Sequence, residues 1–338
     1  MRTVLIYICS VVVFCFSCLG NLYAHSDQTL EFFQAMMGDR GSQQWHKLTK
    51  EMMWTEHSVL VNAQQAIDQY ERSIQYLNHP PIHTIPKTIH FIWIGPKPFP
   101  EKSIANLLSW TNHHPTWKIF FWTDMEDRKP PVEGMEKRLL SNSDFGLCQH
   151  LVEASTSWIE KADLLRYSII YTEGGVYADH DVECIRPFDP LVEHYDFVAG
   201  YAPLHPFAYS LNSPFIPNNG LIVARPHHPI LEKTLFRLRS RWHSFDDTLL
   251  GKNKNKSISR VLYRTFDPFA YCVTRFINAD EYRNIILPTC YFHSATCFKK
   301  ESLQEFIEQE RVYAIHHFDA TWISKHSAPS STRYSQKM

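Results

Sequence analysis

Two short apolar runs place the strongest constraint on how this chain can fold. Lys87–Gly95 and Trp117–Thr123 are almost continuously apolar and rich in β-branched and aromatic residues, which is typical of strands buried on both faces of a parallel sheet. Between them, residues from about Glu101 to Asn112 have the pattern of a helix. Because parallel neighbours need a crossover of this kind, the order strand, helix, strand predicts a βαβ unit and an α/β fold.

A second feature is a group of carboxylates that follows a predicted helix over Ser157–Tyr171. The helix leads into Gly174-Gly175 and then into a predicted strand that carries Asp179, Asp181 and Glu183 at alternate positions. Side chains two apart on a strand share a face, and like charges there repel each other unless a cation lies between them. Carboxylate oxygens suit Mg2+ or Mn2+, so the segment indicates a metal site that holds a diphosphate. The alternative interpretation is a solvated strand end.

Asp163 and Arg166 lie on the predicted helix, three positions apart and therefore on the same face. By themselves they would be interpreted as a surface ion pair, which contributes little to stability. Leu164 and Leu165 beside them indicate instead that much of this helix is buried. A charged pair on a buried helix, close to a carboxylate cluster, favours a functional site that includes both residues.

Two further positions are candidates because of where they fall relative to predicted strands. Trp93 lies at the carboxyl end of the first apolar run, where sheets of this class bind ligands. It is either core packing, which the sequence alone favours, or a surface on which a base stacks. His316 and His317 follow a predicted strand over Val312–Ile315, where a histidine could supply a nitrogen ligand or a phosphate donor.

The chain as a whole suggests one main domain with additions. Residues 1–24 contain an apolar run that is shorter than the roughly 20 residues of a comfortable membrane span. A secretory signal peptide is therefore expected, with a retained membrane anchor as the alternative. Residues 25–84 are predicted to be a helical extension that ends in a proline-rich linker, 85–324 the main domain and 325–338 a polar tail. Within the main domain, Asn218-Asn219-Gly220 is predicted to be a turn before a strand over Leu221–Ala224.

Length and charge narrow the function classes. The 338 residues are enough for one large α/β domain with additions, or for two domains. The formal net charge of −1 gives no field that would attract nucleic acid, so no nucleic-acid partner is expected. The N-terminal segment predicts a secreted protein, or one associated with a membrane and anchored with its main domain on the non-cytoplasmic side.

Four segments occur together in this order: KTIHFIWIG, KADLLRYSIIYTEGGVYADHDV, NNGLIVARPHHP and AIHHFDATW. Together they resemble the DXD-motif sugar-transferase family, which includes yeast-type initiating mannosyltransferases and is related to the glucosyltransferase domains of large clostridial toxins. The resemblance covers roughly residues 85–324, and its most specific part runs from Asp163 to Asp181. It implies a GT-A fold, in which helices flank a Rossmann-like mixed sheet, here with an N-terminal helical extension.

The resemblance also implies a nucleotide-sugar donor (UDP- or GDP-hexose), a Mn2+ or Mg2+ cofactor, and retention of configuration at the anomeric carbon. Metal-binding positions are expected at Asp179, Asp181, His316 and His317. Donor-binding positions are expected at Trp93, Asp163, Arg166, Tyr177, Asp179, Asn219 and Trp322. The catalytic positions among them are Asp163, Arg166 and Asp181. His180 departs from the family, which more often has a small or apolar residue there.

The expected function is that of a metal-dependent, retaining glycosyltransferase that moves a hexose from a nucleotide-sugar donor to a hydroxyl acceptor on a glycan, lipid or protein. Two other classes stay open. A metal-dependent nucleotide-sugar phosphohydrolase would use the same carboxylates, although two-metal hydrolases usually gather more His and Asp ligands than this sequence offers. A non-catalytic module would bind a glycan or a nucleotide sugar without turnover.

Overall fold

The computed structural model describes most of the chain beyond its N-terminal part. The described residues are 35–36, 38, 56–203, 213, 215–244, 260–293 and 298–319, with the backbone alone at 56–60. The predicted signal or anchor over 1–24, the predicted tail over 325–338 and Trp322 lie outside them. Among the described residues, no helix is both long enough and apolar enough to cross a membrane.

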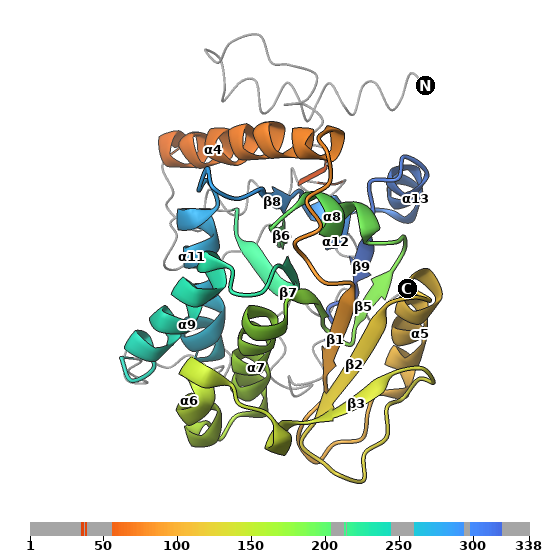
Figure 1. Ribbon diagram of the computed structural model, residues 1–338. Helices are drawn as coiled ribbons and strands as arrows, with labels where there is room; N and C mark the ends of the chain where they lie inside the picture. Colours follow the sequence, from red (N-terminus) through yellow and green to blue (C-terminus); the bar gives the residue numbers. More distant parts are fainter. Residues whose placement is uncertain are drawn as a thin grey trace.

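A mixed seven-stranded sheet forms the centre of the molecule, with strand order β3-β2-β1-β4-β7-β6-β8 (Figure 1). Its strands are β1 (Thr88–Ile92), β2 (Lys118–Thr123), β3 (Glu136–Leu139), β4 (Gly175–Ala178), β6 (Phe197–Tyr201), β7 (Pro217–Ala224) and β8 (Asn284–Leu287). Neighbours pair in parallel except around β7, which is antiparallel to both β4 and β6. A second, two-stranded antiparallel sheet pairs β5 (Val182–Cys184) with β9 (Ala314–His316).

Helices flank the central sheet. In Figure 1, α7, α9 and α11 gather on the left of the sheet and α5 lies on its right. Among the described residues, the α-helices are α4 (Glu56–Ile74), α5 (Ile104–His113), α6 (Gln149–Ala154), α7 (Trp158–Glu173), α8 (Asp189–His194), α9 (Pro229–Arg241), α11 (Asp267–Phe276), α12 (Thr289–Phe292) and α13 (Lys300–Glu308). Short 3-10 turns occur at η1 (Gln75–Asn78), η2 (Glu101–Ser103), η3 (Leu140–Asn142) and η4 (Gly146–Cys148), and η6 (Leu262–Phe266) is a π-helical turn. The α/β class expected from the sequence is confirmed.

Local sequence explains how α7 is placed. Its N-terminus is capped by Ser157, whose side chain accepts from the backbone N–H of Glu160. The helix ends at Gly174, which has a φ of +70° that a residue with a side chain rarely adopts. At the next position, Gly175, a Cβ would lie 2.2 Å from the hydroxyl of Thr88, so glycine permits β4 to approach β1. The pair of glycines therefore turns α7 directly into the central sheet.

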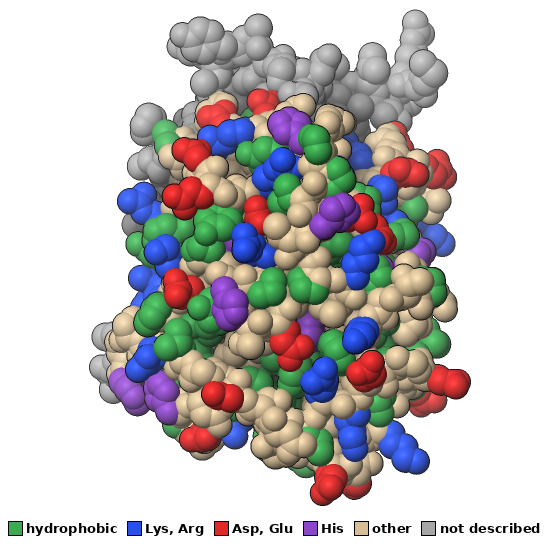
Figure 2. Space-filling model, viewed as in Figure 1, with side chains coloured by type: hydrophobic (Ala, Val, Ile, Leu, Met, Phe, Trp, Pro, Cys, Tyr) green, Lys and Arg blue, Asp and Glu red, His purple; other side chains and the backbone are tan. Residues whose placement is uncertain are grey.

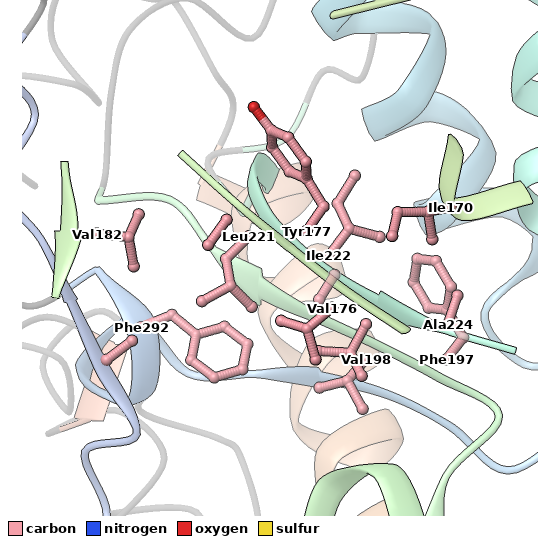
Figure 3. Packing of buried hydrophobic residues seen from close by; sticks show 14 of the residues in the cluster. Ile170, Val176, Tyr177, Val182, Phe197, Val198, Leu221, Ile222, Ala224 and Phe292 are labelled. Atoms are coloured by element: carbon pink, nitrogen blue, oxygen red, sulfur yellow. The ribbon is translucent and has the colours of Figure 1, made fainter. Parts of the chain in front are cut away.

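The core lies around the inner strands. Val176, Val198 and Ile222, from β4, β6 and β7, have no exposed surface, and Figure 3 shows their side chains packed together. Every residue of these three strands is buried. At the molecular surface, basic and acidic side chains of the described residues are interspersed on the face in Figure 2, in keeping with the net charge of −1.

Two predicted elements differ from the structure. The strand predicted to carry three carboxylates is two strands: β4 ends at Ala178, Asp179–Asp181 form a turn, and Glu183 lies on β5 in the second sheet. The predicted turn at Asn218-Asn219-Gly220 is part of β7. Asn218 pairs with Gly200 of β6, and Leu221, directly after the tripeptide, pairs with Ala178 of β4, so pairs at both ends outweigh its turn preference. The register of the β6–β7 ladder shifts between Ala199 and Gly200, which leaves Asn219 and Gly220 without a ladder partner in β6.

The described part of the N-terminal extension packs on the sheet. Helix α4 lies along the edge strand β8, where the amide of Gln69 donates to Asn284 O at 3.2 Å and accepts from Ile286 N at 3.2 Å. The Tyr70 and Tyr291 hydroxyls lie 2.9 Å apart in the same interface. A side-chain amide thus pairs with an edge strand that would otherwise present its backbone to solvent.

Candidate functional site

The turn between β4 and β5 carries Asp179 and Asp181, and the pairing of β5 with β9 brings His316 beside it. The register joins His316 to Val182, the residue after Asp181. Asp179, Asp181 and His316 can each offer one ligand atom, and these atoms all lie within 4.8 Å of one another. Two carboxylates and an imidazole form a donor set that suits a divalent cation such as Mn2+. We call these three residues the metal triad.

Asp181 is held at both carboxylate oxygens. Its Oδ1 lies 3.3 Å from His316 Nε2, and its Oδ2 accepts from the backbone N–H of Asp319 at 2.7 Å. Burial favours the neutral carboxyl, but His316 and the Asp319 amide outweigh burial and hold the pKa of Asp181 below its usual range. For His316, burial lowers the pKa, and the charge of Asp181 outweighs this and raises it. Without a metal ion the two side chains therefore form a buried ion pair, and a bound cation would replace the proton on His316 Nε2.

The other side of His316 is held by two residues that the sequence did not indicate. Phe318 stacks on the His316 ring with 3.9 Å between ring centroids, and His293 Nδ1 lies 3.3 Å from His316 Nδ1. Burial, together with the charge of His316, keeps the pKa of His293 well below its usual range. A neutral His293 can therefore accept from His316 and fix the orientation of its ring.

Gly220 on β7 leaves the space in which the metal triad meets. A Cβ at this position would lie 2.6 Å from His316 Cε1 and 3.0 Å from Asp179 Oδ2. The backbone N–H of Asp179 donates to Gly220 O at 2.8 Å, which holds the turn against β7. Any side chain at this position would push His316 and Asp179 away from the arrangement described.

Asp163 and Arg166 form a buried pair on α7, next to the metal triad. Arg166 Nη2 lies 2.8 Å from Asp163 Oδ1, and the two side chains are 7% and 6% exposed, respectively. Burial raises the pKa of the Asp163 carboxyl, and Arg166 and Thr265 counteract this by favouring the ionised form. Burial alone would lower the pKa of Arg166, but the charges of Asp179, Tyr177 and Asp163 outweigh burial and raise this pKa above its usual value. The guanidinium therefore stays charged.

Arg166 also connects this pair to the metal triad. Its Nη2 lies 3.2 Å from Asp179 Oδ1, and its Nη1 donates to Asn219 O at 2.7 Å. The guanidinium lies 4.6 Å above the ring of Tyr177, whose hydroxyl donates to Asp179 Oδ1 at 2.5 Å. Asp163, Arg166 and Asp179 thus belong to one continuous charged cluster, in which the Arg166 guanidinium lies between two carboxylates.

Sequence reasoning missed Thr265 and Tyr167, which lie around Asp163 and its predicted neighbour Asn219. The Thr265 hydroxyl, on the π-helical turn η6, donates to Asp163 Oδ2, and Asn219 Nδ2 donates to Asp163 Oδ1 at 3.3 Å. Asn219 also donates to the hydroxyl of Tyr167 at 2.7 Å. Tyr167 is four positions after Asp163 on α7, so helical spacing could have indicated it. Thr265 comes from a distant part of the chain, and its local sequence carries no signal.

The structure places Trp93 immediately after β1, beside the turn that carries Asp179 and Asp181. Its ring packs edge-on against His180 at 5.0 Å and Phe99 at 5.3 Å between centroids. His180 is itself held by Ser103, with 2.9 Å between His180 Nδ1 and the Ser103 hydroxyl oxygen. The histidine that departs from the family therefore lies between the metal triad and Trp93.

The remaining candidates separate. Asn219 and Tyr177 join the charged cluster described above. His317 lies 3.0 Å from Glu183, to which its Nε2 is directed, and it is not brought into the metal triad. Trp322 lies outside the described residues. Of the two adjacent histidines proposed as ligands, the structure therefore places His316 with Asp179 and Asp181.

Comparison with known proteins addresses the family. Residues 100–198, which include α7 and the Asp179–Asp181 turn, match the family described as "Glycosyltransferase sugar-binding region containing DXD motif". This segment belongs to the DXD sugar-transferase family. The family resemblance expected from the sequence is thereby confirmed, and Asp163, Arg166, Asp179 and Asp181 all lie in the matched segment.

Relatives of this chain come from yeast and from bacteria. Inositol phosphoceramide mannosyltransferase 3 of Schizosaccharomyces pombe is 34% identical over 136 residues, which are 36% of this chain and 35% of that protein. Subversion of eukaryotic traffic protein A of Legionella pneumophila is 26% identical over 163 residues, 44% of this chain and 24% of that protein. Among solved structures, the PaToxG glycosyltransferase has 20% identity and a TM-score of 0.42, covering 65% of this chain and 82% of that one. The matched part thus spans about a third or less of these two sequence relatives.

Proposed function

We propose that the protein is a metal-dependent, retaining glycosyltransferase that moves a hexose from a nucleotide-sugar donor to a hydroxyl acceptor. The observation that carries this proposal is the convergence of Asp179, Asp181 and His316 within 4.8 Å, next to the buried cation of Arg166. A diphosphate needs positive charge on more than one side, and a divalent ion together with a guanidinium supplies it.

The residues of the metal triad fit a divalent cation. Two carboxylates and one imidazole offer hard oxygen and borderline nitrogen donors, and Gly220 leaves room for them to converge. When bound, Mn2+ or Mg2+ would neutralise the charge that develops on the leaving diphosphate. Asp179, Asp181 and His316 would hold it, and Arg166 would add a second positive charge to the same site. Loss of one such stabilising group typically lowers the rate about a hundredfold or more.

The surroundings of Asp163 favour a positioning role over a covalent one. Its carboxylate already accepts from Arg166, Asn219 and Thr265, so its charge is neutralised and its lone pairs are engaged. Such a carboxylate is a poor nucleophile, and we assign it the orientation of Arg166 and of donor-sugar hydroxyls. With Asp163 engaged in this way, the acceptor hydroxyl itself attacks from the face that the diphosphate leaves. Its proton passes to the departing phosphate oxygen, and the anomeric configuration is retained.

The contacts to the base, the diphosphate and the sugar of the donor are assigned to the other residues predicted from the sequence. Trp93 would stack on the base, Tyr177 and Asn219 would line the diphosphate and the sugar, and Trp322 would close the site. UDP- and GDP-hexoses share this chemistry, and the acceptor hydroxyl belongs to a glycan, a lipid or a protein. Residues 1–24 would export the protein or anchor it, with the catalytic domain on the non-cytoplasmic side.

A donor panel tests the proposal. The full chain is incubated with labelled UDP- and GDP-hexoses and Mn2+, with and without EDTA, and with acceptors that include inositol phosphoceramide, the lipid in the names of several relatives. The expected result is a glycoside that disappears with EDTA and in Asp181→Ala. Sugar 1-phosphate and nucleoside monophosphate, with no glycoside across all acceptors, would favour a phosphohydrolase. Binding of donor without turnover would favour a non-catalytic module. Full activity of Asp181→Ala would refute the metal assignment.

A further inference from the structure

The backbone just after β1 leaves the central sheet and makes a short loop over residues 93–97. The N–H of Trp93 donates to Trp122 O at 2.9 Å, which is the last contact of the β1–β2 ladder. Beyond it, the β1–β2 ladder ends, so the carbonyl groups of the loop have no partner in that ladder. Backbone carbonyls that are partly shielded from water need another partner, and the identity of that partner determines how firmly the loop is held.

Arg128 is the partner of three of these carbonyl groups. Its Nη1 donates to Trp93 O at 2.9 Å, and its Nη2 donates to Gly95 O at 2.6 Å and to Lys97 O at 3.1 Å. The Arg128 side chain is only 10% exposed. A planar guanidinium can reach alternate carbonyls of one loop at the same time, which the compact ammonium group of lysine cannot do with the same geometry.

Asp124 completes the contact by binding a backbone N–H of the loop. Both of its carboxylate oxygens accept from the backbone N–H of Gly95 at 3.1 Å. One of them also lies 3.5 Å from Arg128 Nη1, so the two side chains form an ion pair four residues apart. The pair thus binds both backbone groups of Gly95: Asp124 accepts from its N–H, and Arg128 donates to its carbonyl oxygen.

The same loop orients the ring of Trp93. The indole N–H of Trp93 donates to Lys97 O at 3.0 Å, the same carbonyl oxygen that accepts from Arg128. The backbone carbonyl of Trp93 and the acceptor of its indole are therefore both fixed by one guanidinium. A displacement of Arg128 would release the ring at two points.

We propose that Arg128, supported by Asp124, is the positioning residue that sets the loop over 93–97 and so holds Trp93 ready for the donor base. This inference rests on the proposed function, in which Trp93 stacks on the base. Arg128 does not act as a phosphate ligand, because its two terminal nitrogens are already directed at the carbonyls of Trp93, Gly95 and Lys97. Its contribution is a prearranged surface, which lowers the cost of ordering the loop on binding.

Nucleotide binding by the full chain tests this role. Titration calorimetry with UDP and with GDP, each in the presence of MnCl2, gives the dissociation constant of Arg128→Gln, Arg128→Lys, Trp93→Ala and the double variant Trp93→Ala/Arg128→Gln. Lys129→Gln is the matched control, since Lys129 is the neighbouring cation and is exposed. Circular dichroism and thermal unfolding of each variant show whether it is folded, and Arg128→Lys serves if Arg128→Gln does not fold.

The expected result is specific to a residue that acts through Trp93. Arg128→Gln should weaken binding about tenfold, Arg128→Lys less, and Lys129→Gln not at all. In the double variant the Arg128 effect should disappear, because the ring that it positions is gone. In turnover assays the donor KM should rise while kcat changes little, which a general loss of stability would not produce.

Two results separate the failure of this inference from the failure of the proposed function. If Trp93→Ala weakens binding but the Arg128 variants bind as the wild type does, or if the two effects add fully in the double variant, Arg128 does not position Trp93. If the wild-type protein binds neither UDP nor GDP, or if Trp93→Ala binds both unchanged, the assignment of Trp93 to the donor fails first.

Discussion

Replacing Arg166 by methionine should destabilise the protein strongly, because the change leaves buried carboxylates without their cation. Arg166 lies 2.8 Å from Asp163 and 3.2 Å from Asp179, and it is almost fully buried. Breaking one side of such a pair costs about 3–5 kcal/mol, since the remaining charge has neither water nor a partner. Typical domains are stable by about 5–15 kcal/mol, so the variant should fold but lose a large share of its stability.

Variants of Asp163, the partner of Arg166, test whether the loss of stability comes from the unpaired carboxylate. Asp163→Asn keeps a carbonyl acceptor for Thr265 and leaves Arg166 paired with Asp179, so it should cost only about 1–2 kcal/mol. The double variant Asp163→Asn/Arg166→Met removes the more deeply buried of the two stranded charges and should be more stable than Arg166→Met alone, which corresponds to a coupling of about 1–3 kcal/mol.

Urea unfolding followed by circular dichroism measures these differences, with Arg239→Met, at an exposed arginine on α9, as the matched control. The control should stay within about 0.5 kcal/mol of the wild type. The reasoning is refuted if Arg166→Met is as stable as the control, or if the two single changes simply add in the double variant.

Three further predictions concern pH and the metal triad. His90, His114 and His228 each accept an N–H at one ring nitrogen and lie within hydrogen-bond distance of an oxygen acceptor at the other; burial lowers their pKa, to about 3 for His90 and about 4 for the other two. The unfolded chain binds protons at these histidines near pH 6.5 and the folded chain does not, so the free energy of unfolding should fall as the pH drops from 6.5 towards 4. The fall should be up to about 1.4 kcal/mol per pH unit for each histidine. Urea unfolding that is unchanged between pH 7 and pH 5 would contradict this. His316→Ala should weaken Mn2+ binding at least about tenfold in an electron paramagnetic resonance titration, whereas His317→Ala should leave it unchanged; equal losses would show that His317 is also a ligand. Gly220→Ala keeps all three ligands but should also weaken Mn2+ binding, because its Cβ would lie 2.6 Å from His316 Cε1, and wild-type affinity in this variant would count against the packing described here.

The parts of the fold that were predictable are those whose signal is local. Strands β1 and β2 lie within their apolar runs, and α7 begins at Trp158, one residue after the predicted start at Ser157, because burial and capping leave a pattern over a few neighbouring residues. The pairing of Asp163 with Arg166 followed from helical spacing on the same grounds.

The parts that were not predictable depend on contacts between distant segments. Asp179 and Asp181 read as one strand, yet they form a turn because β5 leaves the central sheet to pair with β9. The tripeptide at Asn218 has the sequence of a turn, yet the pairing of Asn218 with β6 and of Leu221 with β4 keeps it within β7. Thr265 reaches Asp163 through a π-helical turn, for which local sequence gives no periodic signal. Tertiary contacts outweighed local preference in each case.

The pairing of β5 with β9 has a consequence for the order in which the protein becomes competent during translation. All seven strands of the central sheet have left the ribosome once β8, which ends at Leu287, has emerged, but the third member of the metal triad arrives only with β9, at His316. A nascent chain, or one shortened before β9, could therefore acquire most of its core and still lack a complete set of ligands. Competence for metal binding is in this way delayed until β9 has been synthesised and has paired with β5.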